Sequence, residues 1–206
     1  MSDDLIFFTH PQSRGRIARW MLEEVGAEYR TEVVEYGAEM KSPPYIDINP
    51  MGKVPAITHR GHVVTETAAI CAYLADAFPD AGLAPTPEER GAYYRWLFFA
   101  AGPLEAAVIN HHLEFEVPEE RQGMIGYGTY GTVMDVLESE LAKTDYAAGS
   151  RFTAADVYLG SHIGWGFQFE TIEKRTSLVK YWARLEGRPA RRRAEELDNA
   201  LLGSDS

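Results

Sequence analysis

Residues 49–57 read NPMGKVPAI and residues 63–70 read VVTETAAI. The first segment predicts a turn whose two prolines stiffen the backbone ahead of a short strand. The second predicts a helix start, where Glu66 and Thr67 place acid and hydroxyl groups beside free backbone amides. A rigid backbone edge next to such a helix start suits an extended, charged peptide, so the chemistry indicated here is ligand binding.

The composition narrows the possible partners. The chain has 206 residues, 45% of them hydrophobic, enough for one large core or two small ones. A net charge of -11 argues against nucleic acid or an anionic membrane as the main partner. A single cysteine, Cys71, excludes an internal disulfide, and no Cys/His spacing predicts a metal site. Because no signal-peptide pattern or membrane-spanning apolar stretch is present, we expect a cytoplasmic protein.

Strand and helix patterns alternate through residues 1–79. Apolar or β-forming runs predict strands at 5–8, 29–34, 54–58 and 62–65. Helical spacing predicts one helix from Ser13 to a stop at Gly26, and another over 67–78. The helix crossover makes the first two strands parallel, whereas the short gap before 62–65 makes the last two antiparallel. This order predicts a thioredoxin-like α/β domain without a CxxC pair.

Residues 80–87 are rich in proline and small residues and predict an interdomain linker. Residues 88–206 lack strand patterns, so we expect an all-α domain. Its predicted helices cover about 88–114, 119–143, 153–168, 174–186 and 190–201. Thr153 and Asp156 form a capping-box pattern that fixes the start of the third of these helices. Four glycines (Gly123, Gly126, Gly128 and Gly131) predict a bent or locally irregular helix or, alternatively, close helix approach at a subunit or domain interface.

Three motifs, NPMGKVPA at 49–56, TETAAI at 65–70 and RFTAAD at 151–156, resemble bacterial cytosolic glutathione S-transferases. The resemblance covers essentially the whole chain, although the class within the family is open. It implies a thioredoxin-like N-terminal domain that binds glutathione and a helical C-terminal domain that lines the acceptor site. It also implies a homodimer, a detoxification role, and glutathione as cosubstrate with no permanently bound cofactor.

The resemblance gives the binding motif separate roles. Pro55 would be cis, so that the backbone of Val54 pairs antiparallel with the cysteinyl unit of glutathione; a trans proline in an ordinary turn is the alternative. Glu66 and Thr67 would hold the γ-glutamyl end, although the family more often has serine after the glutamate. Alternatively, Thr65 or Glu66 only caps the helix.

The remaining cosubstrate groups are a carboxylate and a thiol. Lys53, or Lys41 in the preceding loop, is expected to pair with the glycine carboxylate of glutathione. The thiol needs a donor that stabilises its thiolate, because a free thiol is mostly protonated at neutral pH. Related enzymes use tyrosine, serine or cysteine in the turn before the first helix, and this turn, THPQSRGR at 9–16, offers Ser13 or Thr9. We favour Ser13, whose alternative role is a simple helix cap.

The acceptor is expected to be a small hydrophobic electrophile bound against the second domain. The candidate side chains on its first predicted helix are Trp96, Phe99, Asn110 and His111, although most aromatic residues there fit a core stripe. Cys71 fits a buried apolar position rather than a nucleophile. The expected activity is glutathione transfer. The alternatives are glutathione-dependent peroxide or disulfide reduction, and a binding protein without catalysis.

Overall fold

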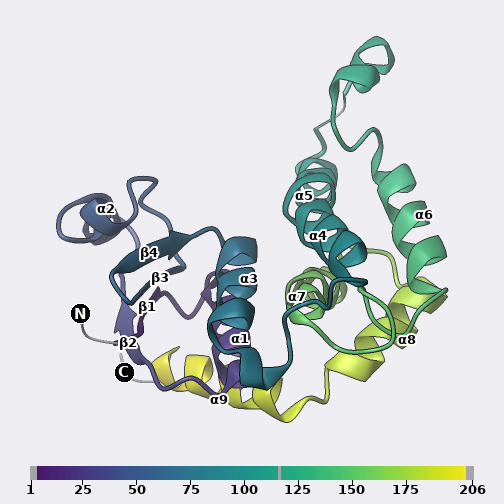
Figure 1. The fold of residues 1–206 in the computed structure, drawn as a ribbon. Helices are drawn as coiled ribbons and strands as arrows, with labels where there is room; N and C mark the ends of the chain where they lie inside the picture. The colour runs from purple at the N-terminus through teal and green to yellow at the C-terminus, as the bar shows by residue number, and fades with distance from the viewer. Residues whose placement is uncertain (1–3, 116, 203–206) are drawn as a thin grey trace. The chain divides into compact units, whose positions relative to one another are not determined.

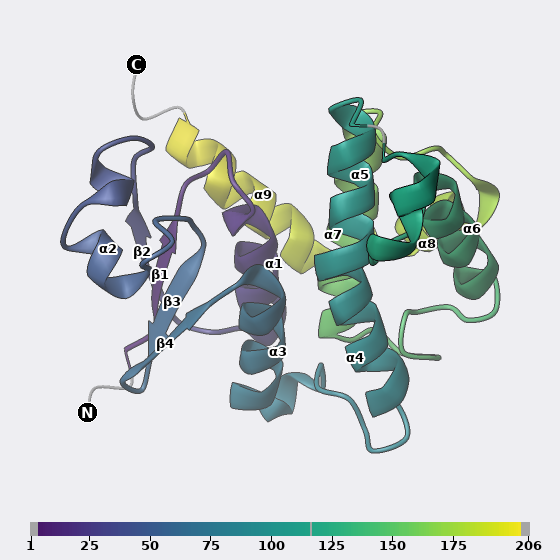
Figure 2. The same cartoon turned by 90° about the horizontal axis from the view of Figure 1, so that it is seen from above.

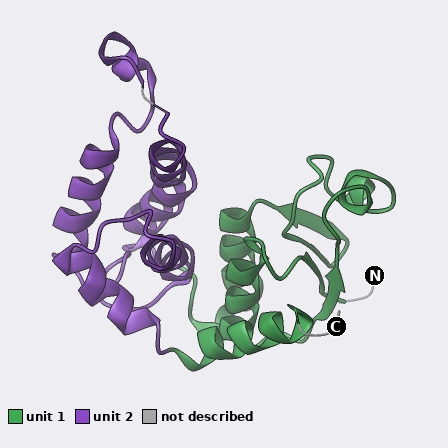
Figure 3. Ribbon diagram, turned by 180° about the vertical axis from the view of Figure 1, so that it is seen from behind, with its two compact units in different colours: residues 1–84, 188–206 green, residues 85–187 purple. Residues whose placement is uncertain are grey.

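The computed structural model describes residues 4–115 and 117–202. The chain separates into two compact units, one made of residues 1–84 with 188–206 and the other of residues 85–187 (Figure 3). No helix in the described ranges is both long and apolar enough to span a membrane. Each unit has its own core and is described separately.

The first unit is built on a four-stranded mixed sheet. Its strands are β1 (Ile6–Thr9), β2 (Arg30–Val33), β3 (Ala56–His59) and β4 (His62–Thr65), in the order β2-β1-β3-β4. β1 runs parallel to β2 and antiparallel to β3, and β3 and β4 form an antiparallel hairpin. Both pairings that the sequence predicted are therefore confirmed.

Helices α1 (Gly15–Val25) and α3 (Thr67–Ala77) cover one face of this sheet (Figures 1 and 2). Ile17, Met21 and Leu22 of α1 are buried, as their helical spacing predicts. Gly26 ends α1 in the left-handed conformation with φ of 64°, which glycine adopts without a steric penalty. The predicted stop signal is confirmed.

The opposite face of the sheet is covered by two short elements that the sequence patterns did not predict. They are η1 (Glu39–Lys41) and α2 (Tyr45–Ile48), and a further single turn, η2 (Pro79–Ala81), follows α3. Met40 and Tyr45 pack with Val34 and Ala56 in a small core under the sheet. A helix of one turn has no measurable apolar periodicity, so only its packing reveals it.

The helix that ends the described chain, α9 (Pro189–Leu202), packs along α1 and groups with the first unit. The sequence pattern had placed it with the helices of the second domain. Buried Arg19 of α1 donates from Nε to Oδ1 of buried Asp198 over 2.7 Å. At the other end of α1, Arg188 pairs with Glu24 through bonds of 2.6 and 2.8 Å. The first ion pair attaches α9 to α1, and the second attaches the residue just before α9 to the end of α1.

The second unit is all-helical in its described residues. Its elements are α4 (Arg90–Phe99), the π turn η3 (Ala100–Leu104), α5 (Glu105–His112), η4 (Glu119–Met124), α6 (Tyr130–Leu141), α7 (Ala154–Gln168) and α8 (Thr176–Leu185). The helix expected over 88–114 is interrupted at η3, which contains Pro103. Proline has no amide hydrogen and crowds the preceding turn, so the regular α-helical ladder breaks there.

The helix expected over 119–143 is wrong in its first half. A 3-10 segment, η4, is followed by irregular backbone until α6 begins at Tyr130. Gly128 has φ of 69°, a conformation outside the right-handed helix. A Cβ at Gly123, Gly126 or Gly128 would meet no other atom of this chain within 4 Å, and the irregular backbone here agrees with the first of the two alternatives.

Helix α7 lies at the centre of the second unit, and most of its residues are buried. Its predicted capping box is present. The carboxylate of Asp156 accepts from the amide of Thr153 at 2.8 Å, the amide of Ala147 at 2.7 Å and the hydroxyl of Tyr181 at 2.8 Å. The loop before α7 and the neighbouring helix α8 are therefore joined to one buried carboxylate.

Candidate functional site

The turn between β1 and α1 holds the first candidate group, Ser13. Its Oγ donates to the carbonyl oxygen of His10 at 2.6 Å and accepts from the amide of Gly15 at 2.9 Å. The half-buried hydroxyl thus closes the turn and satisfies the first amide of α1. Ser13 therefore bonds to the first amide of α1, although the N-cap position itself belongs to Arg14.

Thr9, the other candidate in this segment, is fully buried at 0% exposure. Its hydroxyl lies 3.4 Å from the carbonyl oxygen of His10. A Cβ added at Gly15 would overlap Thr9 Oγ1, so the threonine side chain lies directly against the first residue of α1. Thr9 cannot contact a ligand unless this helix start moves.

The second part of the site is the turn that leads into β3. The Val54–Pro55 peptide bond is cis, as the family resemblance implied. Among the described residues, neither the amide nor the carbonyl of Val54 takes part in a hydrogen bond. An unpaired backbone edge of this kind accepts an extended peptide as an added strand.

Two polar side chains that sequence reasoning missed fix this turn. The hydroxyl of Tyr45 donates to the carbonyl of Lys53 at 2.5 Å, and the Asn49 amide donates to the same carbonyl at 2.7 Å. Asn49 also accepts from the amide of Met51 at 3.1 Å. Burial raises the pKa of Tyr45 to about 12, so its phenol stays a neutral donor. The Asn-Pro pair at 49–50 was the available signal for this turn.

The two candidate lysines differ in what they contact. The ammonium of Lys41 donates to the carbonyl of Met51 at 3.2 Å and to the carbonyl of Gly52. Lys41 therefore braces the turn from η1. Lys53 is exposed, and within residues 4–115 and 117–202 its ammonium has no hydrogen-bond or ion-pair partner. Of the two cations, Lys53 is the one available to an anionic ligand.

Glu66 and Thr67 occupy the N-terminus of α3. Glu66 has φ of 65° and ψ of 114°, and its side chain makes no capping hydrogen bond. A positive φ is uncommon for glutamate and marks a strained position of the type found at ligand sites. Thr67 begins the helix and is 7% exposed. Glu66 therefore occupies the N-cap position of α3 without capping the helix through its side chain.

The four acceptor-site candidates do not form one cluster. Trp96 is 3% exposed and packs edge-to-face on Phe99, with ring centres 5.3 Å apart. Asn110 donates to the hydroxyl of Tyr127 at 2.9 Å. His111 stacks on Tyr130 with ring centres 4.1 Å apart. Trp96 belongs to the core, whereas α5 presents a polar aromatic group whose tyrosines the sequence did not single out.

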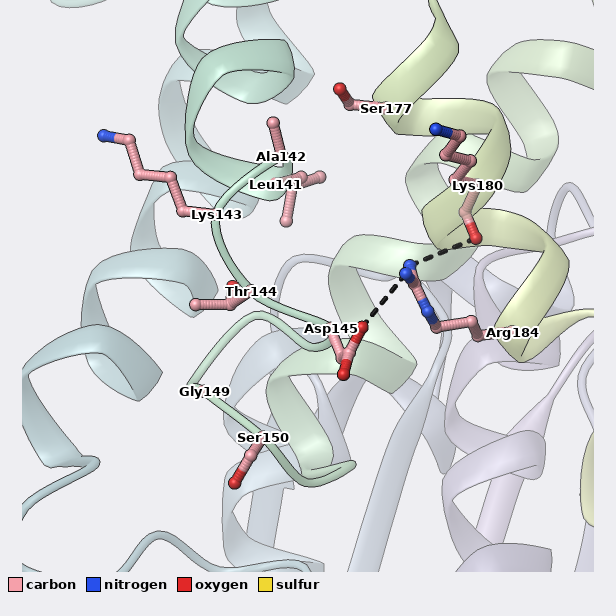
Figure 4. A pocket seen from close by; sticks show the side chains of 10 residues that line it. All are labelled: Leu141, Ala142, Lys143, Thr144, Asp145, Gly149, Ser150, Ser177, Lys180 and Arg184. Atoms are coloured by element: carbon pink, nitrogen blue, oxygen red, sulfur yellow. Dashed lines mark hydrogen bonds and ion pairs between the residues drawn. The ribbon is translucent and has the colours of Figure 1, made fainter.

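A separate pocket of about 510 Å³ lies within the second unit, between the end of α6, the following loop and α8 (Figure 4). It contains none of the four expected acceptor residues. Arg184 contributes two contacts there, Nη2 to Asp145 Oδ1 at 3.0 Å and Nη1 to the carbonyl of Lys180 at 3.2 Å. Lys143 and Lys180 also line the pocket. The charged side chains of the lining are mainly cationic.

The described residues hold neither a reactive cysteine nor a metal cluster. Cys71 is fully buried, and burial raises the pKa of its thiol, which keeps the thiol protonated. No group of three or more His, Cys, Asp or Glu within these residues is arranged to hold a metal ion. A nucleophilic sulfur at this site has to come from a bound ligand.

Comparison with known proteins places the chain among enzymes of one family. Residues 3–76 match the glutathione S-transferase N-terminal domain, and residues 118–189 match the C-terminal domain. Glutathione S-transferase F13 of Arabidopsis thaliana is 29% identical, over 82% of this chain and 84% of the plant protein. Glutathione S-transferase 1 of Schizosaccharomyces pombe is 30% identical, over 73% of this chain and 69% of the yeast protein.

A solved structure gives the same assignment with a ligand in place. The theta-class glutathione S-transferase of Xanthomonas axonopodis pv. citri, with glutathione bound, is 28% identical and superposes with a TM-score of 0.74. The match covers 94% of this chain and 97% of that protein. The two domain matches agree with the relatives, which align over most of the chain, and with the shared fold. The chain therefore belongs to the glutathione S-transferase family.

Proposed function

We propose that this protein is a glutathione transferase, which binds glutathione on its first unit and directs the thiolate onto an electrophilic small molecule. The observation that carries the proposal is the unpaired backbone of Val54 beside cis Pro55. Among ordinary ligands, an edge with one free amide and one free carbonyl selects a peptide. Family membership supports glutathione as that peptide.

Each end of glutathione then has a matching group. The cysteinyl backbone pairs with Val54, and the γ-glutamyl carboxylate binds at the N-terminus of α3, where Thr67 donates its hydroxyl. Glu66 accepts from the γ-glutamyl ammonium. The exposed ammonium of Lys53 pairs with the glycine carboxylate. Lys41 supports this site through the carbonyls of Met51 and Gly52 rather than by direct contact.

Ser13 is the proposed donor to the sulfur, because it is only partly buried while Thr9 is fully buried against the first residue of α1. In the reaction, the glutathione thiol loses its proton to solvent and the thiolate attacks the electrophilic carbon. A carbon–sulfur bond forms as the bond to the leaving group breaks, and the leaving group carries away the electron pair. Ser13 lowers the barrier by keeping the sulfur ionised before the attack.

We propose that residues 1–79 form the glutathione domain, 80–87 the linker and 88–206 the helical domain, except that the last helix, α9, packs on α1 and belongs with the glutathione domain. Half-buried Phe99 and the Asn110 and His111 group supply the acceptor surface, while Trp96 supports it from the core.

We also propose a cytoplasmic homodimer with a detoxification role. Exposed apolar side chains on both units, with Met51 at 69% and Phe98 at 73%, favour contact with a second copy.

The test combines binding with two activity assays. Calorimetry measures the affinity for glutathione and for S-methylglutathione, which has no ionisable thiol. Conjugation of an aryl chloride and reduction of an organic peroxide are then followed with the same protein. Conjugation supports the proposal. Peroxide reduction without conjugation would favour the reductase alternative, binding without either activity would favour a binding protein, and absence of binding would reject the proposal.

A further inference from the structure

Arg16, in the first turn of α1, joins the Ser13 turn to the last helix of the chain. Its Nε donates to the carbonyl oxygen of Pro11 at 2.5 Å. Its Nη2 donates to Oδ1 of Asn199 in α9 at 2.8 Å. One guanidinium therefore contacts, at the same time, the turn that carries Ser13 and a residue of α9 that lies 183 positions after Arg16 in the sequence.

The Asn199 end of this connection is fixed independently of Arg16. The neighbouring residue, Asp198, is buried in its ion pair with Arg19. At the far end of the same interface, Arg188 pairs with Glu24. Because α9 is held at both places, the position of Asn199 is set by helix packing, and Asn199 in turn orients the Arg16 guanidinium.

At its other end, the connection acts on the turn through the bond from Arg16 to the Pro11 carbonyl. Pro11 is one of the two residues enclosed by the turn that closes when the amide of Ser13 donates to the carbonyl of His10 at 3.0 Å. Holding the Pro11 carbonyl limits rotation of the peptide planes that aim the Ser13 hydroxyl. The same contact keeps a permanent positive charge beside the turn, and such a charge favours a nearby thiolate.

We propose that Asn199, acting through Arg16, is a positioning residue for the thiol-activating turn. This inference rests on the proposed transferase function. Asn199 touches no substrate; it keeps Arg16 on the Pro11 carbonyl, and this preserves both the aim of Ser13 and the local charge. The C-terminal helix is in this way a working part of the glutathione half of the enzyme.

Other charged or titratable groups near the turn could also affect the ionisation of a bound thiol. His10 lies 3.6 Å from Glu35 through its Nε2, and its Nδ1 accepts from the amide of Gln12. Arg14 precedes α1, and Asp198 interacts electrostatically with Arg16. Since all of these groups are retained in variants of Asn199, a change in thiol ionisation in those variants reports the Arg16 connection.

The test uses Asn199→Leu and Arg16→Gln, with Arg16→Lys as the conservative variant. Glu24→Gln is the matched control, because it weakens the α1–α9 interface away from the turn. The first readout is the thiol pKa of bound glutathione, obtained from the pH dependence of kcat/KM for the electrophile at saturating glutathione. The others are the absorbance of the bound thiolate and the Kd for S-methylglutathione. Asn199 is exposed, so Asn199→Leu is expected to fold, and a thermal melt confirms this.

The expected result is a thiol pKa raised by roughly half a unit to one unit in Asn199→Leu and Arg16→Gln, which lowers kcat/KM below that pKa about three- to tenfold. Arg16→Lys retains the positive charge but lacks the planar guanidinium that can donate two hydrogen bonds at once. Its thiol pKa should therefore lie between those of these variants and that of the wild type. The Kd for S-methylglutathione should change less than about twofold, and Glu24→Gln should leave the pKa unchanged.

An unchanged thiol pKa in Asn199→Leu would overturn the inference. An equal shift in Glu24→Gln would also overturn it, because general loosening of the interface would then explain the effect. The proposed transferase function fails separately, since that failure appears in the wild-type protein as absent binding or absent conjugation and would overturn both proposals. A shifted pKa in Ser13→Ala together with an unshifted one in Asn199→Leu rejects only the positioning role.

Discussion

The hydroxyl of Ser13 donates its single proton to the carbonyl oxygen of His10 over 2.6 Å. To serve a thiolate, the hydroxyl must exchange this neutral hydrogen bond for a charged one. A hydrogen bond to a charged acceptor is about 1 kcal/mol stronger than one to a neutral acceptor. The exchange therefore stabilises the thiolate by only about 1 kcal/mol, which lowers the pKa of the glutathione thiol by somewhat less than one unit. The amide of Gly15, which donates to Ser13 Oγ, strengthens the hydroxyl as a donor.

Replacement Ser13→Ala is expected to raise the pKa of bound glutathione by about one unit or less and to lower kcat/KM at neutral pH by up to roughly tenfold. The affinity for S-methylglutathione should stay nearly constant, because the other binding groups are untouched. Thiolate absorbance as a function of pH measures the shift. Thr9→Val is the control, since buried Thr9 should not affect the thiol. A shift in Thr9→Val with none in Ser13→Ala would exchange their roles.

Thr67→Val is expected to weaken glutathione binding about tenfold or more, because a hydroxyl bond to a carboxylate is lost while the shape of the side chain is kept. Thr67→Ser keeps the hydroxyl and should bind close to the wild-type level. Calorimetric titration of both variants separates the hydroxyl from the methyl group. Equal affinity in Thr67→Val and the wild type would remove Thr67 from the binding site.

Glu66→Gly is expected to leave the free energy of unfolding unchanged or raise it by up to about 1 kcal/mol, because glycine relieves the strain at φ of 65°. Glutathione affinity should fall at the same time, since the carboxylate that meets the γ-glutamyl ammonium is gone. The matched control is Glu114→Gly at φ of 54°, which should relieve strain without affecting binding. Denaturant melts and calorimetry check both quantities. Full affinity in Glu66→Gly would contradict the assigned role.

Asp156→Ala is expected to destabilise the protein by more than about 3 kcal/mol, because it leaves buried donors of the α7 start and of Tyr181 without an acceptor. Tyr181→Phe removes one donor and should cost about 1–2 kcal/mol. Burial raises the pKa of Asp156, and the four donated bonds oppose that effect. Urea unfolding measures both variants. A smaller loss in Asp156→Ala than in Tyr181→Phe would refute this network.

Arg151 lowers the pKa of Glu89 chiefly by donating side-chain hydrogen bonds to it. A lowered folded-state pKa gives stability that is present above the unfolded-state pKa, about 4.3, and is lost as the pH falls through the folded-state value. Arg151→Gln should therefore cost about 1 kcal/mol at pH 7 and progressively less in acid.

The control for this ion pair is Arg193→Gln, because the exposed pair of Arg193 with Glu196 is 3.7 Å long. Its effect should be negligible at every pH. Thermal melts between neutral pH and the acid limit of the fold measure the difference between the two variants. A loss that does not depend on pH in Arg151→Gln would assign the stabilisation to packing of the arginine stem.

Much of the fold could be predicted because its signals are local. Apolar runs and helical spacing place β1, α1, α3 and α7 within one or two residues, and Gly26 and the Thr153 and Asp156 pair mark helix ends through chemistry within one turn. The failures have a common cause. The π turn at Pro103 and the irregular backbone before Tyr130 interrupt sequences that still carry helical spacing, and α2 is too short to show any periodicity.

The amino-acid sequence alone was enough to identify the family and to predict a glutathione-binding motif, because the residues of that motif lie within one turn and one helix start. The difference in burial between Ser13 and Thr9 appears only in the folded protein, since the burial of Thr9 beside Gly15 depends on how α1 packs on the sheet. Only the tertiary structure brings Asn199 to Arg16, because α9 returns to α1 after the whole helical unit. Contacts between distant segments leave no periodicity in the sequence, so the packing of helices had to reveal them.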